Sequence, residues 1–264
     1  MPGDASLHGK IAVITGAGGD IGGATAVLMA QRGAAVVAVD RRAESLDALR
    51  GRMPAGARLL TVTADVTIED QVAGYVAAAK AEFGRVDLFF NNAGIEGSRS
   101  GAWRTIPDLS LADFDEIIAV NATGVFLGLK HVMAVMAAAG GGAIVNTSSI
   151  NGLKGSRGQV AYVASKHAVT ALTVVAAREG AVSNIRVNAI APGAINGRMM
   201  RDYLEIVRAN APSPAGSPSH YRPPPIARWA EPREIAGLVA FLSSDDAASI
   251  TGACYSVDGG LIAM

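Results

Sequence analysis

Thr15-Gly16-Ala17-Gly18-Gly19-Asp20-Ile21-Gly22-Gly23 stands between a short apolar run, Lys10–Thr15, and a helical pattern that extends from Ala24 to Gln31. A strand, a glycine-rich turn and a helix in that order bring backbone N–H groups and the positive end of a helix dipole to a bound phosphate. Glycine clusters after strands also form plain turns, so this stretch alone leaves both interpretations open. In either case it predicts a strand–turn–helix unit.

The same alternation of short apolar runs and longer helical patterns continues to about residue 190. Repeated βα units predict a parallel sheet, with helices on both faces and ligands outside the carboxyl ends of the strands. We therefore predict an α/β fold, a single Rossmann-type doubly wound domain over residues 1–264. The seven expected strands are Lys10–Thr15, Ala35–Asp40, Arg58–Thr63, Val86–Phe90, Gly142–Thr147, Ile185–Ile190 and Ala253–Val257.

The composition is that of a globular chain with balanced charge. Half of the residues (50%) are hydrophobic, and 23 basic residues offset 23 acidic ones, so no broad positive surface for nucleic acid or an anionic membrane is expected. The single cysteine, Cys254, lies in an apolar run and is expected to be a buried thiol. No histidine has metal-ligand spacing, so no metal site is predicted. Without a secretory pattern or a long uninterrupted apolar run, a cytoplasmic location is expected.

The glycine run and three sets of polar residues lie at four successive predicted strand ends. After the glycine run, Asp40 ends the second strand, where a carboxylate accepts hydrogen bonds from both hydroxyls of an adenosine ribose and repels the phosphate of NADP. The alternatives are that Asp40 caps the next helix, or that Arg41 and Arg42 hold that phosphate. Asp65 follows the third strand and Asn91-Asn92 the fourth. Together these positions favour a dinucleotide, and NAD over NADP.

Tyr162 and Lys166 lie one helical turn apart at the start of an apolar helix, on one face of it. A cation about 4 Å from the phenol, at an effective dielectric constant of ~20, is worth ~4 kcal/mol. That interaction would lower the tyrosine pKa from near 10 to roughly 7, a value suited to an acid/base. The alternative is an amphipathic helix with a half-buried tyrosine and a surface lysine.

Two further polar residues accompany this pair. Ser149 follows the fifth predicted strand, and its hydroxyl is expected to hydrogen-bond a substrate oxygen beside Tyr162, although serine there also forms turns. Asn121 interrupts an apolar helical stretch, and because a buried amide needs partners it is predicted to hold a proton-relay water. The set indicates transfer of a hydride between nicotinamide and a secondary alcohol or ketone.

The segment from Asn196 to Arg228 breaks the βα rhythm, because it holds three isolated prolines and the run Pro223-Pro224-Pro225. A long irregular segment inside a domain is typical of a functional lid or a linker, and the helical pattern at Pro232–Leu242 favours a lid. We expect the lid, with Glu96–Trp103 and Ser149–Val160, to enclose a mainly apolar small molecule.

These residues resemble the short-chain dehydrogenase/reductase family over nearly the whole chain. The matching motifs are Thr15-Gly16-x-x-x-Asp20-x-Gly22, Asn91-Asn92-Ala93-Gly94, Asn121, Ser149, Tyr162-x-x-x-Lys166, Asn188-Ala189-Ile190-Ala191-Pro192-Gly193 and the closing Asp258-Gly259-Gly260. The resemblance implies that Tyr162 is the acid/base, that Lys166 lowers its pKa and binds the nicotinamide ribose, that Ser149 orients the substrate oxygen and that Asn121 positions a relay water. It also implies a homotetramer.

Within the family the chain is similar to bacterial reductases of cyclic ketones, whereas reductases of 3-oxoacyl thioesters or acetoin, and a catalytically silent NAD sensor, are alternatives. The expected cofactor residues are Gly16, Gly18, Asp20, Ile21, Gly22, Asp40, Arg41, Asp65, Val66, Asn92, Ala93, Gly94, Tyr162, Lys166, Pro192, Gly193 and Ile195. The expected substrate residues are Glu96, Ser149, Asn151, Val160, Tyr162, Met199, Met200 and Tyr203.

Two positions depart from the family pattern. Asp20 replaces a glycine, and Gly197 replaces a threonine that would donate a hydrogen bond to the nicotinamide carboxamide. Asp20 is expected to cap the first helix, with its carboxylate directed away from the pyrophosphate. Gly197 predicts weaker anchoring of the nicotinamide.

Overall fold

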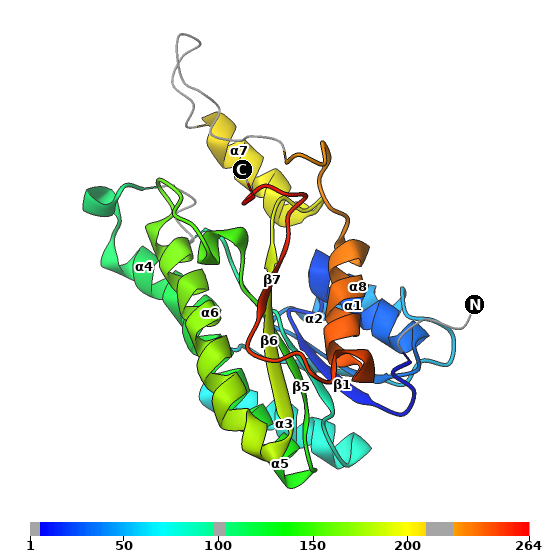
Figure 1. The fold of residues 1–264 in the computed structure, drawn as a ribbon. Coiled ribbons are helices and arrows are strands. Elements are labelled where there is room, and N and C mark those ends of the chain that lie inside the picture. The colour runs from blue at the N-terminus through cyan, green and yellow to red at the C-terminus, as the bar shows by residue number, and fades with distance from the viewer. Residues whose placement is uncertain (1–5, 98–103, 210–223, 264) are drawn as a thin grey trace.

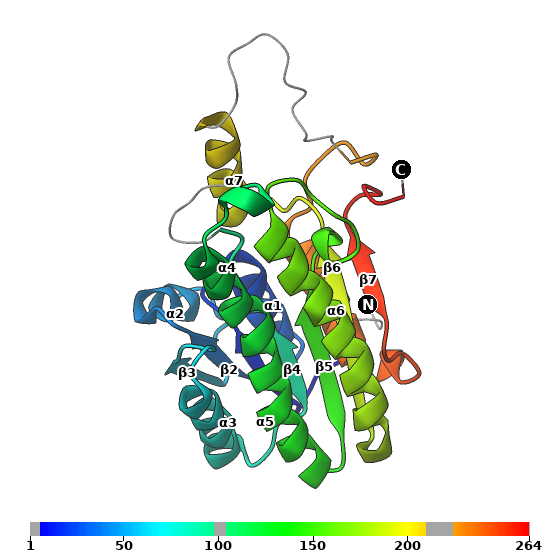
Figure 2. The same ribbon diagram turned by 90° about the vertical axis from the view of Figure 1, so that its left-hand side faces the viewer.

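The computed structural model describes residues 6–97, 104–209 and 224–263, which form a seven-stranded parallel sheet between two layers of helices (Figures 1 and 2). The strand order is β3-β2-β1-β4-β5-β6-β7, so the chain builds one half of the sheet outward from β1 and then the other half from β4. The strands are β1 (Ile11–Thr15), β2 (Ala35–Asp40), β3 (Leu59–Thr63), β4 (Leu88–Asn91), β5 (Gly142–Thr147), β6 (Ile185–Pro192) and β7 (Cys254–Val257).

This architecture confirms the predicted Rossmann-type fold, with strand bounds that differ by up to two residues from those expected. The largest differences are at β4, which begins at Leu88, and at β6, which continues to Pro192. The helices are α1 (Asp20–Gln31), α2 (Ala43–Arg50), α3 (Glu69–Phe83), α4 (Leu111–Ile118), α5 (Gly124–Ala138), α6 (Val160–Gly180), α7 (Arg198–Ala209) and α8 (Pro232–Ser243).

Alternation of side chains along the strands produces two hydrophobic cores, one on each face of the sheet. Val13 and Phe89 point to the face covered by α3, α5 and α6, whereas their neighbours Ile14 and Phe90 point to the face covered by α1, α2 and α8. Both faces are buried, so β1 and β2 are apolar up to their last residues, Thr15 and Asp40, as is typical of parallel sheets.

Two helical stretches in the described part of the chain, Leu111–Ala138 and Val160–Ser183, have the length and hydropathy of a membrane span, and 44% of each apolar window is buried inside the fold. Their inner faces cover the sheet, which accounts for much of their apolar character. A π-helical turn at Ala119–Thr123 divides the first stretch into α4 and α5.

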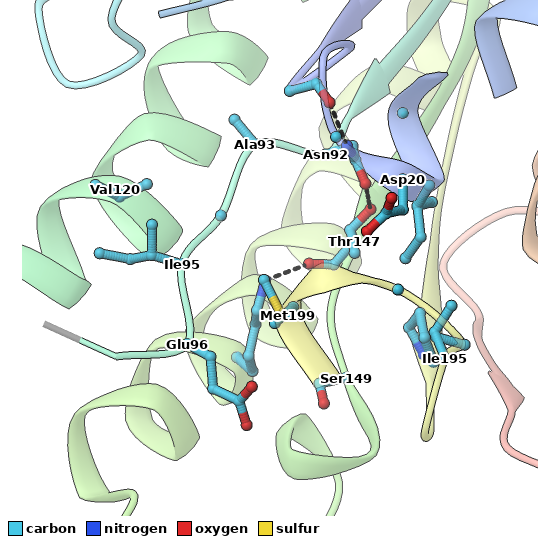
Figure 3. Close-up of a pocket in the computed structure, with 18 of the residues that line it drawn as sticks. Asp20, Asn92, Ala93, Ile95, Glu96, Val120, Thr147, Ser149, Ile195 and Met199 are labelled. Atoms are coloured by element: carbon cyan, nitrogen blue, oxygen red, sulfur yellow. Dashed lines mark hydrogen bonds between the residues drawn. The ribbon is translucent and has the colours of Figure 1, made fainter. Parts of the chain in front are cut away.

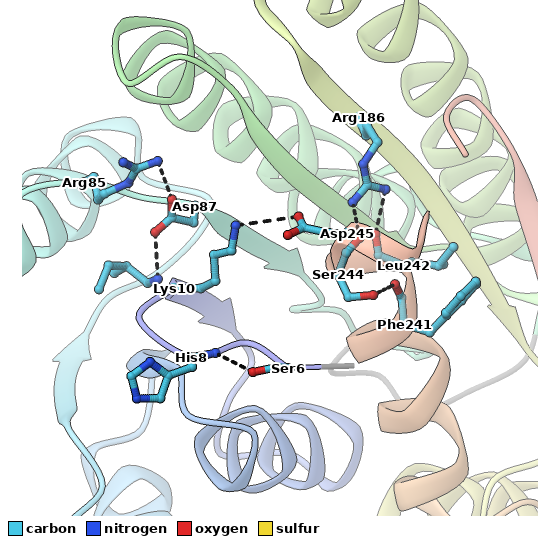
Figure 4. Close-up of polar contacts among 11 residues, drawn as sticks. Ser6, His8, Lys10, Arg85, Asp87, Arg186, Phe241, Leu242, Ser244 and Asp245 are labelled. Carbon is cyan, nitrogen blue, oxygen red and sulfur yellow. Dashed lines mark hydrogen bonds and ion pairs between the residues drawn. The ribbon is translucent and has the colours of Figure 1, made fainter. Parts of the chain in front are cut away.

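Polar contacts at the amino ends of the strands hold the edge of the sheet opposite the predicted site (Figure 4). The buried carboxylate of Asp87 accepts a hydrogen bond from the Ile11 N–H at 2.9 Å and pairs with Arg85 at 2.6 Å. The Arg186 guanidinium donates to the carbonyls of Leu242 and Ser244 at the end of α8. These contacts fix β1, β4, β6 and α8 relative to one another.

Candidate active site

A pocket of about 570 Å³ opens at the carboxyl ends of the strands, where β1 and β4 lie side by side and the strand order reverses (Figure 3). Segments that follow β1, β2, β3, β4, β5 and β6 all contribute to its wall, together with the first turns of α1 and α7. The switch point of a doubly wound sheet is the expected position for a ligand. The structure therefore brings the predicted nucleotide and chemical residues together in one site.

The glycine run forms a tight turn from β1 into α1. Gly16 has φ of 64°, a left-handed conformation that favours glycine, and its carbonyl accepts a hydrogen bond from the Gly19 N–H at 3.1 Å. A Cβ on Gly22 would collide with the Gly16 carbonyl oxygen. The N-cap residue of α1 is Gly19, which offers no side-chain acceptor, so the first turn of α1 presents its N–H groups to the pocket.

Asp40 connects the second strand to this turn. One carboxylate oxygen accepts from the Gly18 N–H at 3.0 Å and the other from the Arg42 N–H at 3.1 Å. The N-cap of α2 is Arg42, so Asp40 is not the helix cap considered as an alternative. Gly18 is not among the described residues that line the pocket, because it faces Asp40 and Ser45.

Hydrogen bonds also hold the ends of the next two strands, locally after β3 and between distant segments after β4. The Asp65 carboxylate accepts from the backbone and the hydroxyl of Thr67, and both Asp65 and Val66 line the pocket. The Asn92 amide donates to the Thr15 carbonyl at 3.0 Å and accepts from the Thr147 hydroxyl at 3.2 Å. Asn92 thus ties β1, β4 and β5 together at the switch point.

Tyr162 and Lys166 project from α6 into the buried end of the pocket, with Ser149 near the phenol. The side chains of Tyr162 and Lys166 are only 8% and 3% exposed. The Lys166 ammonium lies 5.7 Å from the Tyr162 ring centroid and donates to the Thr147 carbonyl at 2.9 Å. The helical spacing therefore places the two groups on one face, as predicted.

The predicted lowering of the Tyr162 pKa to about 7 is wrong for this geometry. Burial raises the pKa of Tyr162, the nearby Glu96 carboxylate raises it further, and a hydrogen bond from Ser149 lowers it. Burial lowers the pKa of Lys166 to about 8, although Glu96 opposes this shift. Desolvation of the buried phenol has the largest effect on the pKa of Tyr162.

The carboxyl group of Glu96 raises the pKa values of both Tyr162 and Lys166. Burial raises its pKa to about 7, against the lowering effect of a hydrogen bond from Gln159. That bond, from the Gln159 amide nitrogen, is 2.9 Å long, and the Gln159 oxygen accepts from Asn151 at 2.8 Å. Gln159 was not predicted from the sequence, because nothing in the residues next to it indicates a contact with Glu96.

Asn121 lies in the π-helical turn, and its side chain is fully buried. The amide oxygen accepts from the Ile95 N–H at 2.8 Å, and the amide nitrogen donates to the Ile95 carbonyl and to the Ser165 hydroxyl. The side chain therefore fixes the loop after β4 against α6. A part in a proton relay stays a prediction.

Most, but not all, of the residues predicted to contact the substrate line the pocket. Glu96, Ser149, Asn151, Met199 and Met200 line the pocket. Val160 is not among the described lining residues, because α6 begins there and Gln159 faces the pocket instead. The Tyr203 side chain and residues 98–103 lie outside the part of the chain that the structure describes.

The expectation that Asp20 caps α1 is wrong. Asp20 is the first residue of α1, and Gly19 is the N-cap. Its carboxylate instead accepts a hydrogen bond from the Arg198 N–H, 2.6 Å away at the start of α7. The remaining expected cofactor residues lie along the pocket wall; they are Gly16, Ile21, Gly22, Arg41, Ala93, Gly94, Pro192, Gly193 and Ile195.

A glycine turn at a Rossmann switch point beside a buried Tyr-Lys-Ser group defines a class of nucleotide-dependent oxidoreductases. The chain belongs to the short-chain dehydrogenase/reductase family, and residues 16–262 match the family described as "Enoyl-(Acyl carrier protein) reductase".

Two of the similar curated proteins are named for cyclohexane derivatives, and a third is named for levodione. The chain is 40% identical to the levodione reductase of Leifsonia aquatica over 95% of this chain and 93% of that protein. It is 42% identical to the cis-4-hydroxycyclohexanecarboxylate dehydrogenase of Sinomonas cyclohexanicum (97% of each chain) and 38% identical to the cyclohexanol dehydrogenase of Acinetobacter sp. strain SE19 (96% and 95%).

Solved structures resemble the fold closely. The crystal structure of levodione reductase matches with a TM-score of 0.90 at 40% identity, over 97% of this chain and 98% of that chain. The structure of an NAD⁺-bound xylitol dehydrogenase matches with a TM-score of 0.87 at 36% identity, over 96% and 99%.

Asn121→Ala is expected to destabilise the protein by about 2–4 kcal/mol, because it removes a buried side chain and both of its hydrogen bonds to the partly buried N–H and carbonyl of Ile95. A urea titration followed by circular dichroism measures the loss. Asn196→Ala, which removes one exposed hydrogen bond to Glu231, is the control and should stay within ~0.5 kcal/mol of the wild type. Equal stability of the two variants would contradict the structural role of Asn121.

Proposed function

We propose that the protein is an NAD-dependent oxidoreductase that moves a hydride between nicotinamide and a secondary alcohol or ketone of cyclic or otherwise apolar character. One observation carries the proposal: the Tyr162, Lys166 and Ser149 group and the glycine turn with Asp40 lie in the same pocket. An acid/base for the hydroxyl proton and an anion-binding turn for a dinucleotide are the two parts that such a reaction needs.

The residues of the pocket fit a dinucleotide. The uncapped first turn of α1 suits a pyrophosphate, and a Cβ at Gly22 would obstruct the turn. The buried carboxylate of Asp40 suits two ribose hydroxyls and disfavours a phosphate at that position, although Arg41 and Arg42 line the same region. The NAD⁺-bound xylitol dehydrogenase supports NAD as the cofactor.

When bound, NAD supplies the hydride acceptor for alcohol oxidation or the donor for ketone reduction. Tyr162 takes the hydroxyl proton as the alcohol is oxidised and returns it in the reverse direction. Ser149 hydrogen-bonds the substrate oxygen and keeps it at the phenol. Lys166, fixed by the Thr147 carbonyl, places a positive charge near the phenolate that forms.

The substrate wall supports a ring-shaped molecule with limited polarity. Met199 and Met200 supply adaptable apolar surface, and Ile95 and Ile150 also line the pocket. Glu96, with its pKa raised to about 7, supplies one polar group that accepts or donates a hydrogen bond near neutral pH. Relatives named for levodione and cyclohexanol support this substrate class.

We further propose a cytoplasmic homotetramer without nucleic-acid or membrane partners. Apolar side chains on the outer surfaces of α5 and α6 support self-association, since Phe126, Val174 and Val175 are each about half exposed. A stable contact between copies would bury such side chains.

Tyr162→Phe is expected to lower the rate of NADH formation from cyclohexanol by about 10²–10⁴-fold, because it removes the acid/base. The Kd for NAD should change little, since the ring remains. NADH absorbance and calorimetry measure the two quantities. Tyr255→Phe on β7, outside the pocket, is the matched control and should keep its activity. Retained turnover in Tyr162→Phe would refute the catalytic assignment, and NAD binding without turnover in the wild type would favour the sensor.

Asp40→Ala and Asp40→Asn are both expected to lower the preference for NAD over NADP by roughly tenfold to a hundredfold, the range for hydrogen bonds to a charged group. The alanine variant also loses the bond to the Gly18 N–H and should bind both nucleotides more weakly. The asparagine variant keeps an acceptor there and isolates the charge. Calorimetric titration with each nucleotide measures the ratio, and an unchanged ratio in both variants would contradict the ribose role.

Glu96→Gln is expected to move the pH midpoint of alcohol oxidation downward, by roughly one unit for the loss of one nearby buried charge. The sign follows from the ionised Glu96, which raises the pKa of Tyr162, so its removal lets the phenolate form at lower pH. Initial rates at saturating NAD across pH 6–11 measure the midpoint. Glu82→Gln, an exposed carboxylate on α3, is the control. A midpoint that stays in place or rises would contradict this coupling.

A further inference from the structure

The start of α7 lacks a side-chain cap of its own. The helix begins at Arg198, and the Arg201 N–H donates to the Gly197 carbonyl at 3.2 Å, so Gly197 occupies the N-cap position. Glycine has no side-chain oxygen that could accept from the first-turn N–H groups. Asp20 supplies that acceptor from a distant part of the chain, because its carboxylate oxygen lies 2.6 Å from the Arg198 nitrogen.

Gly197 is buried, and the space beside its Cα is filled by the same carboxylate. A Cβ built on Gly197 would lie 2.6 Å from the Asp20 carboxylate oxygen, which is closer than real contacts allow, and 3.1 Å from the carboxyl carbon, which is a tight contact. Any side chain at residue 197 would therefore displace the Asp20 carboxylate from the Arg198 N–H. The two departures from the family pattern are therefore linked: the Asp20 carboxylate fills the space that a side chain at residue 197 would need.

We propose that Asp20, from another helix, supplies the side-chain acceptor that the N-cap Gly197 lacks at the start of α7, and that residue 197 is glycine so that this contact can form. The contact joins the first residue of α1, at the nucleotide turn, to the helix whose Met199 and Met200 line the pocket. Asp20 is accordingly a positioning residue: it holds the substrate wall at a fixed place relative to the cofactor turn.

The arrangement also accounts for a carboxylate so close to the predicted pyrophosphate. An acidic group at the mouth of an anion site is unfavourable when it points toward the anion. Engaged with the Arg198 N–H, the Asp20 carboxylate faces α7 and takes part of its stabilisation from the positive end of that helix.

Amide hydrogen exchange of the segment 196–203 in the free protein tests the cap directly, without any ligand. Asp20→Ala and Gly197→Ala should each speed exchange at the start of α7 by about fivefold, the size of effect typical of a lost N-cap acceptor. The double variant should be no faster than either single one, because both substitutions break the same contact. Asp20→Asn, which keeps an oxygen acceptor, should restore most of the protection.

Gly74→Ala is the matched control, since a Cβ at that exposed position of α3 meets no atom within 4 Å and leaves exchange at α7 unchanged. Normal exchange in Gly197→Ala, additive effects in the double variant, or exchange in Asp20→Asn as fast as in Asp20→Ala would each overturn the proposal.

The consequence for the site rests on the proposed function and is measured with NAD and cyclohexanol as probes. Asp20→Ala and Gly197→Ala should raise the KM for cyclohexanol more than they lower kcat, and Asp20→Asn should reverse most of that rise. Faster exchange with an unchanged KM would overturn the positioning role. If the wild type fails to oxidise cyclohexanol with NAD, the proposed function is what fails, and hydrogen exchange still decides the Asp20 contact.

Discussion

The common direction of the seven strands brings every carboxyl end to one edge of the sheet, and the reversal of strand order between β1 and β4 separates the connections there. A parallel strand can only be followed by a crossover, so each strand end becomes a place where the chain leaves the sheet and exposes a few polar groups. The pocket depends on this constraint. At its base, the Asn92 amide joins the ends of β1 and β5 across β4.

Within that pocket, desolvation sets the electrostatic balance. Tyr162, Lys166 and Glu96 are all withdrawn from water, and burial shifts the pKa of each toward its neutral form. Near pH 7 the Tyr162 phenol is therefore neutral. Lys166 and Glu96 have pKa values of about 8 and about 7, so both gain or lose a proton close to neutral pH. One added charge nearby would shift the pKa values of these three side chains strongly, because a low-dielectric environment screens electrostatic interactions weakly.

The sequence was sufficient to predict whatever depends on local periodicity. The order of βα units, the strand ends that carry Asp40 and Asp65, and the shared face of Tyr162 and Lys166 all follow from patterns within a few residues. What could not be predicted depends on contacts between distant segments. The partner of Asp20 lies 178 residues away, Gln159 meets Glu96 across 63 residues, and the pKa directions depend on how completely the folded chain excludes water.

The catalytic groups and the substrate wall differ in how they are held. Lys166 is held by a backbone carbonyl of β5, and Asn121 makes two hydrogen bonds to Ile95 in the loop after β4 and one to Ser165 on α6, so this part of the site is anchored to the core of the fold. The wall on α7 is joined to the nucleotide turn through one exposed hydrogen bond at Asp20. Exposed contacts open at a lower free energy than the buried core does. The hydrogen bond at Asp20 is therefore expected to open more readily than the buried bonds that hold Lys166 and Asn121.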